Sequence, residues 1–559
     1  MRHRSKTNLS QAPMTNLIQD PAPSRHPRLV HRAAIAWCTA PFLAAIILYV
    51  RKLHLSLDGD YHGWSSANCF TMARAFNALG ALHMRFVPFQ NNLPVGSDPD
   101  VYLHWPPLYP LVLAGFLRIF GDTPAAGRIL ELLIVLVTTP VVMLIARRLF
   151  SPHVALLSGF FYLTCRATFQ GASAIVQQPL AMLFASASVL FFLLAVRAAP
   201  NTAPRIADAK DEPAHGIFSL LGVFCVVLTI LTAWDPVFIP FGLLAGSVFL
   251  RHRAGIRLSI IYIGAAAIAF AGVQTDYILS YPAMFKNQLA TIAYRAGLHF
   301  DANSSIHLHS IADSANYAAH YSIFWLIEHI CDNIYDFVGP FALLASCIVL
   351  AIWLQAARLR ERHPAPSTVL LLFGLGLPWI VWTLAMPNYM AIHSFTLVLA
   401  APFVAISSAF VLDAIWDFLS VNPQRKPFLW IMVGIFPLLI LYPLIMGIGN
   451  AHMLEGAPQF SDLSAVVEHN TPLDAIVISP CESFVPVYYS HRHSIRGIES
   501  DRLLQSVIGQ ARTDFPGDPL FLAIEDADRK DLPVALSHLK PLAQQGDSTV
   551  YSLSDSNTR

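Results

Sequence analysis

Residues 125–150 read AAGRILELLIVLVTTPVVMLIARRLF, and this stretch decides the class of fold. Its apolar run over residues 125–146 is long enough to cross a bilayer, whose hydrocarbon core needs about 20 apolar residues per helix. Only Arg128 and Glu131 interrupt the run with charge, and they lie one helical turn apart, where they can pair. The run ends in Arg147 and Arg148, which is typical of the cytoplasmic end of a membrane span. The stretch therefore predicts a transmembrane helix.

The whole chain has the composition of a membrane protein. Of its 559 residues, 55% are hydrophobic and 13% are charged, whereas a soluble chain carries about 25% charged residues. The net charge of +1 argues against a nucleic-acid partner, because such a protein needs a basic surplus to bind phosphates. The seven cysteines form no Cys-x-x-Cys pair, so the sequence favours neither a zinc motif nor a redox motif.

Similar apolar runs recur along the chain and predict a polytopic α-helical membrane protein with about 11 transmembrane helices. We expect them at residues 33–50, 125–146, 153–169, 179–196, 216–233, 237–250, 257–275, 337–357, 367–386, 391–412 and 428–449. The stretch 106–121 is short and begins with two prolines, so we expect an interfacial helix there. Residues 1–32 are polar and basic, and we expect a disordered cytoplasmic tail.

The basic residues between the predicted spans indicate the orientation of the chain. With a cytoplasmic N-terminus, every inside loop carries arginine or lysine, as the positive-inside rule requires. The outer side then holds loops 51–124 and 276–336 of a transmembrane domain at residues 33–450. Residues 451–559 alternate short apolar strands with helical segments. They predict a small α/β domain in the periplasm or outside the cell.

Titratable side chains gather in the outer loops rather than inside the spans. Such a site suits a substrate with a lipid tail in the bilayer and a polar head in water. A sugar joined to a polyprenyl phosphate already carries a good leaving group, so the protein must supply a base for the acceptor hydroxyl and cations for the phosphate. Asp58 or Asp60 can be the base. The candidate phosphate ligands are Arg74, Arg85, Lys286 and Arg295.

The two aspartates also have a purely structural interpretation, because Asp is a common N-cap residue. The stretch that follows them, GWSSANCFTMARAFNALG (63–80), predicts an amphipathic helix that ends near Gly80. We expect four of its apolar residues to face lipid: Trp64, Ala67, Phe70 and Phe76. Asp235, at an outer turn, is likewise expected to be a helix cap, with a place in the site as the alternative.

The order of several segments resembles that of the GT-C glycosyltransferases. An uncleaved first span is followed by DGDY (58–61), FNALGALHMRF (76–86), YLHWPPLYPLVLAGFLRIFG (102–121) and the stretch quoted above. The resemblance covers roughly residues 33–450, and it is greatest to the branch that contains dolichyl-phosphate-mannose protein mannosyltransferases and aminoarabinose lipid A transferases. The C-terminal α/β region also resembles the periplasmic tail of many such enzymes.

The resemblance implies an inverting glycosyltransferase of the bacterial inner membrane. Its donor would be a polyprenyl-phosphate sugar and its acceptor a lipid, a glycan or a protein. We expect no metal site, with a divalent metal ion as the alternative. Asp58 matches the proposed catalytic base of the family's first outer loop, with Asp60 as its rival. Donor-binding roles are implied for Arg295, Tyr389 and His393. We expect sugar-binding or acceptor-binding roles for Tyr61, His62, His104 and Gln178, with a structural role at the membrane interface as the alternative for His104.

The sequence departs from the family pattern at two positions. Gly59 stands where the family has a second acid beside the base, and Gln178 stands where an Asp often precedes a proline. These departures keep open a non-catalytic relative that acts as an assembly subunit. A transporter or flippase of lipid-linked intermediates is the other alternative, and it predicts functional charges inside the spans.

Overall fold

The computed structural model describes residues 43, 46–47, 49–51, 53, 63–90, 101–198, 212–282, 288–289, 292–293, 295–296, 323–338, 346–349, 366–421, 427, 461–479, 490, 492–496, 501–525 and 539–553. Among the expected spans, those at 33–50, 337–357 and 428–449 lie largely outside these residues. So do five of the predicted site residues, Asp58, Asp60, Tyr61, His62 and Lys286.

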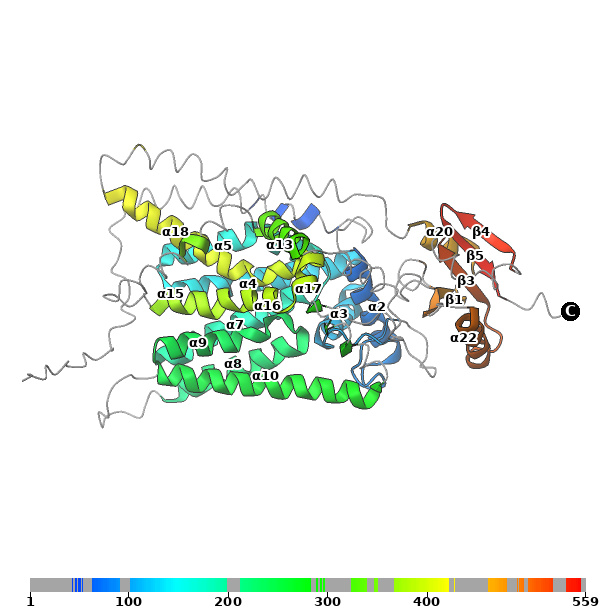
Figure 1. Cartoon of the computed structure of the whole chain (residues 1–559), viewed down its shortest axis with the longest axis horizontal. Helices are drawn as coiled ribbons and strands as arrows, with labels where there is room; N and C mark the ends of the chain where they lie inside the picture. Colours follow the sequence, from blue (N-terminus) through cyan, green and yellow to red (C-terminus); the bar gives the residue numbers. More distant parts are fainter. Residues whose placement is uncertain are drawn as a thin grey trace, which may run out of the picture.

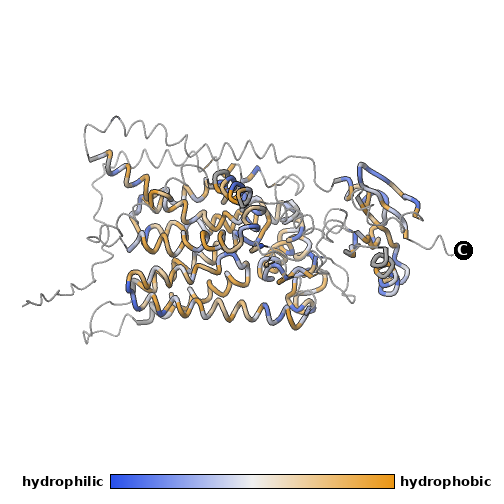
Figure 2. Tube along the Cα trace, in the orientation of Figure 1, coloured by the Kyte–Doolittle hydropathy of each residue, from blue (hydrophilic) through white to orange (hydrophobic). Residues whose placement is uncertain are grey.

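The described part of the membrane region is a bundle of helices that run side by side (Figure 1). Apolar residues cover most of its length (Figure 2). Its helices are α2 (Gly63–Leu79), α3 (Leu108–Phe120), α4 (Pro124–Leu149), α5 (Pro152–Thr164), α6 (Arg166–Ser173), α7 (Gln178–Ala198), α8 (Glu212–Thr232), η2 (Asp235–Phe238), α9 (Ile239–Phe249), α10 (Arg253–Ser280), α13 (Ile323–Val338), α15 (Pro366–Leu371), η3 (Leu372–Gly376), α16 (Leu377–Ala385), α17 (Pro387–Ile392), η4 (Ser394–Leu399) and α18 (Ala401–Val421).

Four helices of the described residues are long and apolar enough to cross a membrane: Pro124–Leu149, Gln178–Val196, Arg253–Ser280 and Pro366–Ala385. Three shorter apolar helices accompany them: Leu108–Phe120, Gly216–Thr232 and Asp235–Phe249. The first of these, α3, has 13 residues, which is too short for a full crossing. The total of 11 spans stays a prediction.

Two expected spans differ from the helices observed. The span expected at 153–169 is divided, because Cys165 has an extended backbone (φ −65°, ψ 129°) that ends α5 and starts α6. The span expected at 391–412 begins later. Residues 394–399 form the 3-10 helix η4, and the α-helix α18 starts only at Ala401.

The orientation expected for α2 is wrong for three of its four apolar residues. Ala67, Phe70 and Phe76 are all less than 5% exposed and belong to the protein core. Phe70 packs against Gly127 of α4, where an added Cβ would lie 2.8 Å from the Phe70 ring. The amphipathic pattern was correct, but its apolar face meets α3 and α4 rather than lipid. The helix ends as expected, since Gly80 adopts a φ of +87°.

Basic residues mark one end of the helix bundle. Arg147 and Arg148 end α4, and Arg251 and Arg253 lie between α9 and α10. Helices α2 and α3 lie at the opposite end, where α4 begins and α10 finishes (Figure 1). The described parts of the loops predicted to be inside, at residues 147–151 and 250–253, thus lie at the other end of the helices from the described part of the predicted outer loop 51–124.

The C-terminal residues form a five-stranded mixed sheet of order β2-β1-β3-β5-β4. Strands β1 (Ile476–Ser479), β2 (His493–Arg496) and β3 (Leu520–Glu525) are parallel, and β5 (Ser548–Ser552) pairs antiparallel to β3 and to β4 (Pro541–Gln545). Helices α20 (Ser461–Asn470) and α22 (Asp501–Asp514) complete this α/β unit. The sheet lies beyond α2 and α3 (Figure 1). The boundaries at 451 and 559 stay predictions.

Candidate functional site

A narrow cleft opens at the end of the bundle that holds α2 and α3. Five parts of the chain meet there: the start of α2, the extended segment before α3, the residues just before α7, Arg295, and the turn that carries α17. Polar and aromatic side chains dominate its wall. The lining residues are Ser65, Asn68, Cys69, Tyr102, Trp105, Val176, Gln177, Arg295, Tyr389 and His393.

The wall formed by residues 102–105 is non-helical, so its backbone carbonyls need partners from other elements. Three consecutive carbonyls accept hydrogen bonds from side chains distant in sequence. Gln288 donates to Leu103 O (2.7 Å), Trp234 Nε1 to His104 O (2.9 Å), and the Tyr277 hydroxyl to Trp105 O (2.9 Å). This arrangement fixes the Trp105 indole, which is 6% exposed, at the cleft.

The Arg295 guanidinium lies over two aromatic rings of the cleft. Its Cζ is 4.8 Å from the centroid of the Tyr389 ring and 5.6 Å from that of Trp105. These contacts orient the cation and stabilise it by a cation–π attraction. Within the described residues Arg295 forms no ion pair, in contrast to Arg74, whose Nε lies 2.7 Å from Asp122 Oδ2. The cleft therefore contains an oriented positive charge suited to an anion.

Tyr389 is fixed from two sides. On α13, Asn333 donates to the carbonyls of Met390 and Ala391, both at 3.1 Å, and so anchors α17. Behind the cleft, Gln178 Nε2 donates to the Tyr389 hydroxyl oxygen (3.3 Å) and to Asp235 Oδ2 (3.1 Å). Burial raises the pKa of Asp235 to about 7, although the hydrogen bond from Gln178 and the charge of Arg295 both act to lower it.

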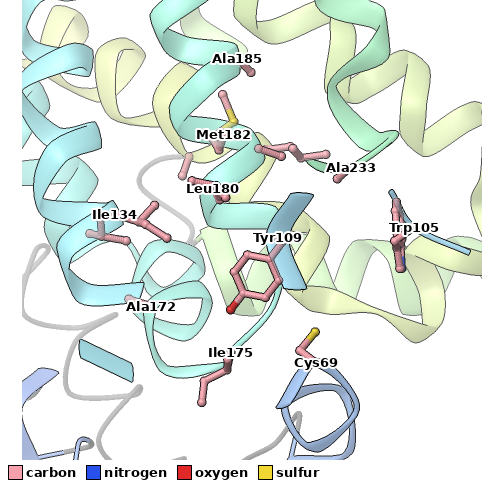
Figure 3. Packing of buried hydrophobic residues seen from close by; sticks show 14 of the residues in the cluster. Cys69, Trp105, Tyr109, Ile134, Ala172, Ile175, Leu180, Met182, Ala185 and Ala233 are labelled. Atoms are coloured by element: carbon pink, nitrogen blue, oxygen red, sulfur yellow. The ribbon is translucent and has the colours of Figure 1, made fainter. Parts of the chain in front are cut away.

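The opposite wall depends on buried polar contacts of α2. Asn68 accepts from Gln90 (2.9 Å), and Cys69 Sγ lies 3.7 Å from Gln177 Oε1. Below them the Tyr109 hydroxyl donates to Glu131. Figure 3 shows Tyr109 among the buried residues near Cys69 and Ile175. Arg128 donates to the carbonyl of Ser173 (3.2 Å), so Arg128 and Glu131 of α4 each contact another part of the chain.

The structure brings together three of the predicted donor-binding residues, Arg295, Tyr389 and His393, which all line the cleft. The Tyr389 and His393 rings lie 4.8 Å apart. Arg74 pairs with Asp122, and Arg85 is exposed in the turn after α2. Neither residue lines the cleft.

The predicted sugar-binding or acceptor-binding residues that are described lie beside the cleft rather than in its wall. Gln178 is fully buried behind the cleft, while its neighbour Gln177 lines it. The His104 ring contacts Tyr102 at 4.9 Å, and Tyr102 lines the cleft.

Sequence reasoning missed Trp105, Asn68 and Gln177 as site residues and favoured a cap role for Asp235 over a place in the site. The sequence did contain a signal for Trp105. It directly precedes two prolines, which keep it out of the following helix and in an extended segment. Asn68 and Gln177 had none, because a polar residue of an apolar helix can equally be a buried structural group. Within the described residues, no group of three or more His, Cys, Asp or Glu side chains is placed to hold a metal ion.

A search of curated protein sequences gave no match. The family model for dolichyl-phosphate-mannose-protein mannosyltransferases matches residues 104–205, a range that contains α3 to α7. Among solved structures, ArnT from Cupriavidus metallidurans in the apo state is similar over 93% of this chain and 98% of that one, with 14% identity and a TM-score of 0.57. The chain has the GT-C fold. The resemblance found in the sequence is therefore confirmed.

Two further GT-C structures contain lipid phosphates. ArnT from the same organism bound to undecaprenyl phosphate is 15% identical, with a TM-score of 0.57 and the same coverage of both chains. The oligosaccharyltransferase AglB from Archaeoglobus fulgidus, in complex with an inhibitory peptide and a dolichol-phosphate, is 13% identical with a TM-score of 0.51. That match covers 88% of this chain and 70% of AglB.

The three carbonyl contacts yield a prediction about the order of the cleft wall. Tyr277→Phe leaves the Trp105 carbonyl without its donor, which costs about 1 kcal/mol. We expect about fivefold faster amide hydrogen exchange in residues 101–105 of the solubilised protein. Tyr281→Phe, on the same side of the molecule, is the control, because the Tyr281 hydroxyl makes no hydrogen bond within the described residues. Equal exchange in the two variants would contradict the assignment.

Proposed function

We propose that this protein transfers a glycosyl group from a polyprenyl-phosphate-linked sugar to a lipid, glycan or protein acceptor, with inversion at the anomeric carbon. One observation carries the proposal. The Arg295 guanidinium is held over the Trp105 and Tyr389 rings in a cleft at the end of the apolar helix bundle that holds α2 and α3. An oriented cation at a membrane edge is suited to a phosphate that carries a lipid tail.

The comparisons support this choice of donor. ArnT binds undecaprenyl phosphate and AglB binds a dolichol-phosphate, and both share the fold of this chain. The described spans contain few charged groups, and the charged pair of α4 is engaged in contacts within the protein. This arrangement favours an enzyme with its site at the membrane surface over a transporter with charges along its path.

The chemistry requires one base and one group that stabilises the leaving phosphate. An acceptor hydroxyl attacks the anomeric carbon from the face opposite the phosphate, a C–O bond forms as the glycosyl–phosphate bond breaks, and the acceptor proton goes to the base. We assign the base to Asp58 or Asp60, because the cleft residue Ser65 follows Asp60 by only five positions in the sequence. Arg295 would stabilise the charge that develops on the phosphate.

The assignment of the base is tested by Asp58→Asn, Asp60→Asn and the double variant, assayed with lipid-linked sugars as donors. Loss of a general base lowers the rate by about 10²–10⁴-fold. We expect this loss in the double variant and in one single variant. Asp122→Asn, which removes an exposed outer carboxylate paired with Arg74, is the control and should retain activity. Full transfer activity in the double variant would exclude both aspartates.

The phosphate site is tested by Arg295→Gln. A charge-assisted hydrogen bond to a phosphate is stronger than a neutral one by about twofold, and we expect KM for the lipid-linked donor to rise by at least tenfold. Arg74→Gln is the matched control, because Arg74 is bound to Asp122 outside the cleft. An unchanged KM in Arg295→Gln, or an equal rise in both variants, would show that Arg295 does not bind the donor.

We propose that the cleft lies on the outer face of the cytoplasmic membrane. In a cysteine-free background, Ser97→Cys and Ser500→Cys should react with a membrane-impermeant maleimide added from outside. Ala365→Cys, next to the basic stretch 358–362, should react only after permeabilisation. The reverse labelling pattern would place the cleft on the cytosolic side of the membrane and would contradict the proposed location.

A further inference from the structure

Asp235 is a buried carboxylate directly behind the cleft, and the glycosyl transfer proposed here does not use it as the base. Asp235 is 1% exposed, and it is the first residue of η2, at the turn after α8. Its Oδ2 accepts from Gln178 Nε2, and Gln178 is fully buried. Within the described residues, neither Asp235 Oδ1 nor Gln178 Oε1 has a hydrogen-bond partner. Burial of such groups is costly, so their retention needs an explanation.

The chemistry of the carboxylate fixes the orientation of the Gln178 amide. A carboxylate oxygen can only accept, so Gln178 must direct its NH₂ group toward Asp235. The same nitrogen lies 3.3 Å from the Tyr389 hydroxyl oxygen. The phenol therefore accepts from Gln178 and must direct its own O–H toward another acceptor. Protonation of Asp235 at Oδ1 would not change the direction of these hydrogen bonds, because Oδ2 would still accept from Gln178.

Tyr389 lines the cleft, and the Arg295 guanidinium lies over its ring. A phosphate bound by Arg295 would therefore lie near the phenol. We propose that Asp235 is a positioning residue that, through the orientation of Gln178, makes Tyr389 a hydrogen-bond donor to the phosphate of a lipid-linked substrate. This inference rests on the proposed function, and it assigns a role to Gln178 that differs from direct contact with the substrate.

The alternative orientation shows what Asp235 prevents. If residue 235 offered an NH₂ group, Gln178 could rotate its amide and present Oε1 to Tyr389. The phenol would then donate to Gln178, and the phosphate would lose a donor. Asp235→Asn permits this rotation with almost no change in volume. Gln178→Met replaces the amide by a thioether, which accepts hydrogen bonds only weakly, and so releases the phenol again.

The test measures binding of undecaprenyl phosphate to the full chain in nanodiscs, with undecaprenol as the phosphate-free reference. We expect Asp235→Asn and Tyr389→Phe each to weaken binding about tenfold. The double variant Asp235→Asn/Tyr389→Phe should be no weaker than Tyr389→Phe alone, because both changes remove the same donor. Asp235→Asn/Gln178→Met should bind within about twofold of the wild type.

The outcomes separate the two proposals. Additive losses in the double variant, or no recovery with Gln178→Met, would overturn the role of Asp235, because a purely structural defect is not relieved by a second change. If the wild-type protein binds undecaprenol as tightly as undecaprenyl phosphate, the proposed function itself is wrong. Asp122→Asn should bind like the wild type in every case.

Discussion

The site depends on how the carbonyl groups of the non-helical segment before α3 are satisfied. A helix satisfies its own carbonyls, but residues 103–105 lie outside a helix, because Pro106 and Pro107 delay the start of α3 to Leu108. In a protein that is mostly apolar, water is a poor substitute. Side chains from α10, from the turn after α8 and from residue 288 therefore converge on three consecutive carbonyls. That convergence places Trp105 where Arg295 can lie over it.

The position of Arg295 follows from this support and from α17. Two rings, Trp105 and Tyr389, lie 5.8 Å apart and present their faces to one guanidinium. Aromatic faces attract a cation without neutralising it, whereas a carboxylate would compete with a phosphate for the same N–H groups. Arg74, which is bound to Asp122, shows the second situation in the same chain. The two arginines look equivalent in the sequence, and only their neighbours distinguish them.

The sequence predicted what depends on local composition. The apolar runs at 125–146, 179–196 and 257–275 correspond to α4, α7 and α10, and the end of α2 at Gly80 follows from a glycine that tolerates positive φ. The prediction of the three cleft residues Arg295, Tyr389 and His393 came from their outer loops. The prediction that the apolar face of α2 points toward lipid was wrong. A helix face that packs on α4 has the same apolar sequence pattern as one that packs on lipid. Asp235 was interpreted as a cap because nothing in the sequence shows that Gln178 lies beside it.

Gln178 illustrates why a single departure from a family pattern is a poor guide to function. Considered alone, a glutamine in place of an acid suggests a lost carboxylate. In the structure a carboxylate is present one hydrogen bond away, on Asp235 of another element, and the amide connects it to Tyr389. The carboxylate near the cleft and the group that contacts Tyr389 therefore belong to two different residues, Asp235 and Gln178. The NH₂ group of the Gln178 amide donates both to Asp235 and to the Tyr389 hydroxyl oxygen. An ionised carboxylate at position 178 could only accept hydrogen bonds, so it could not make these two contacts.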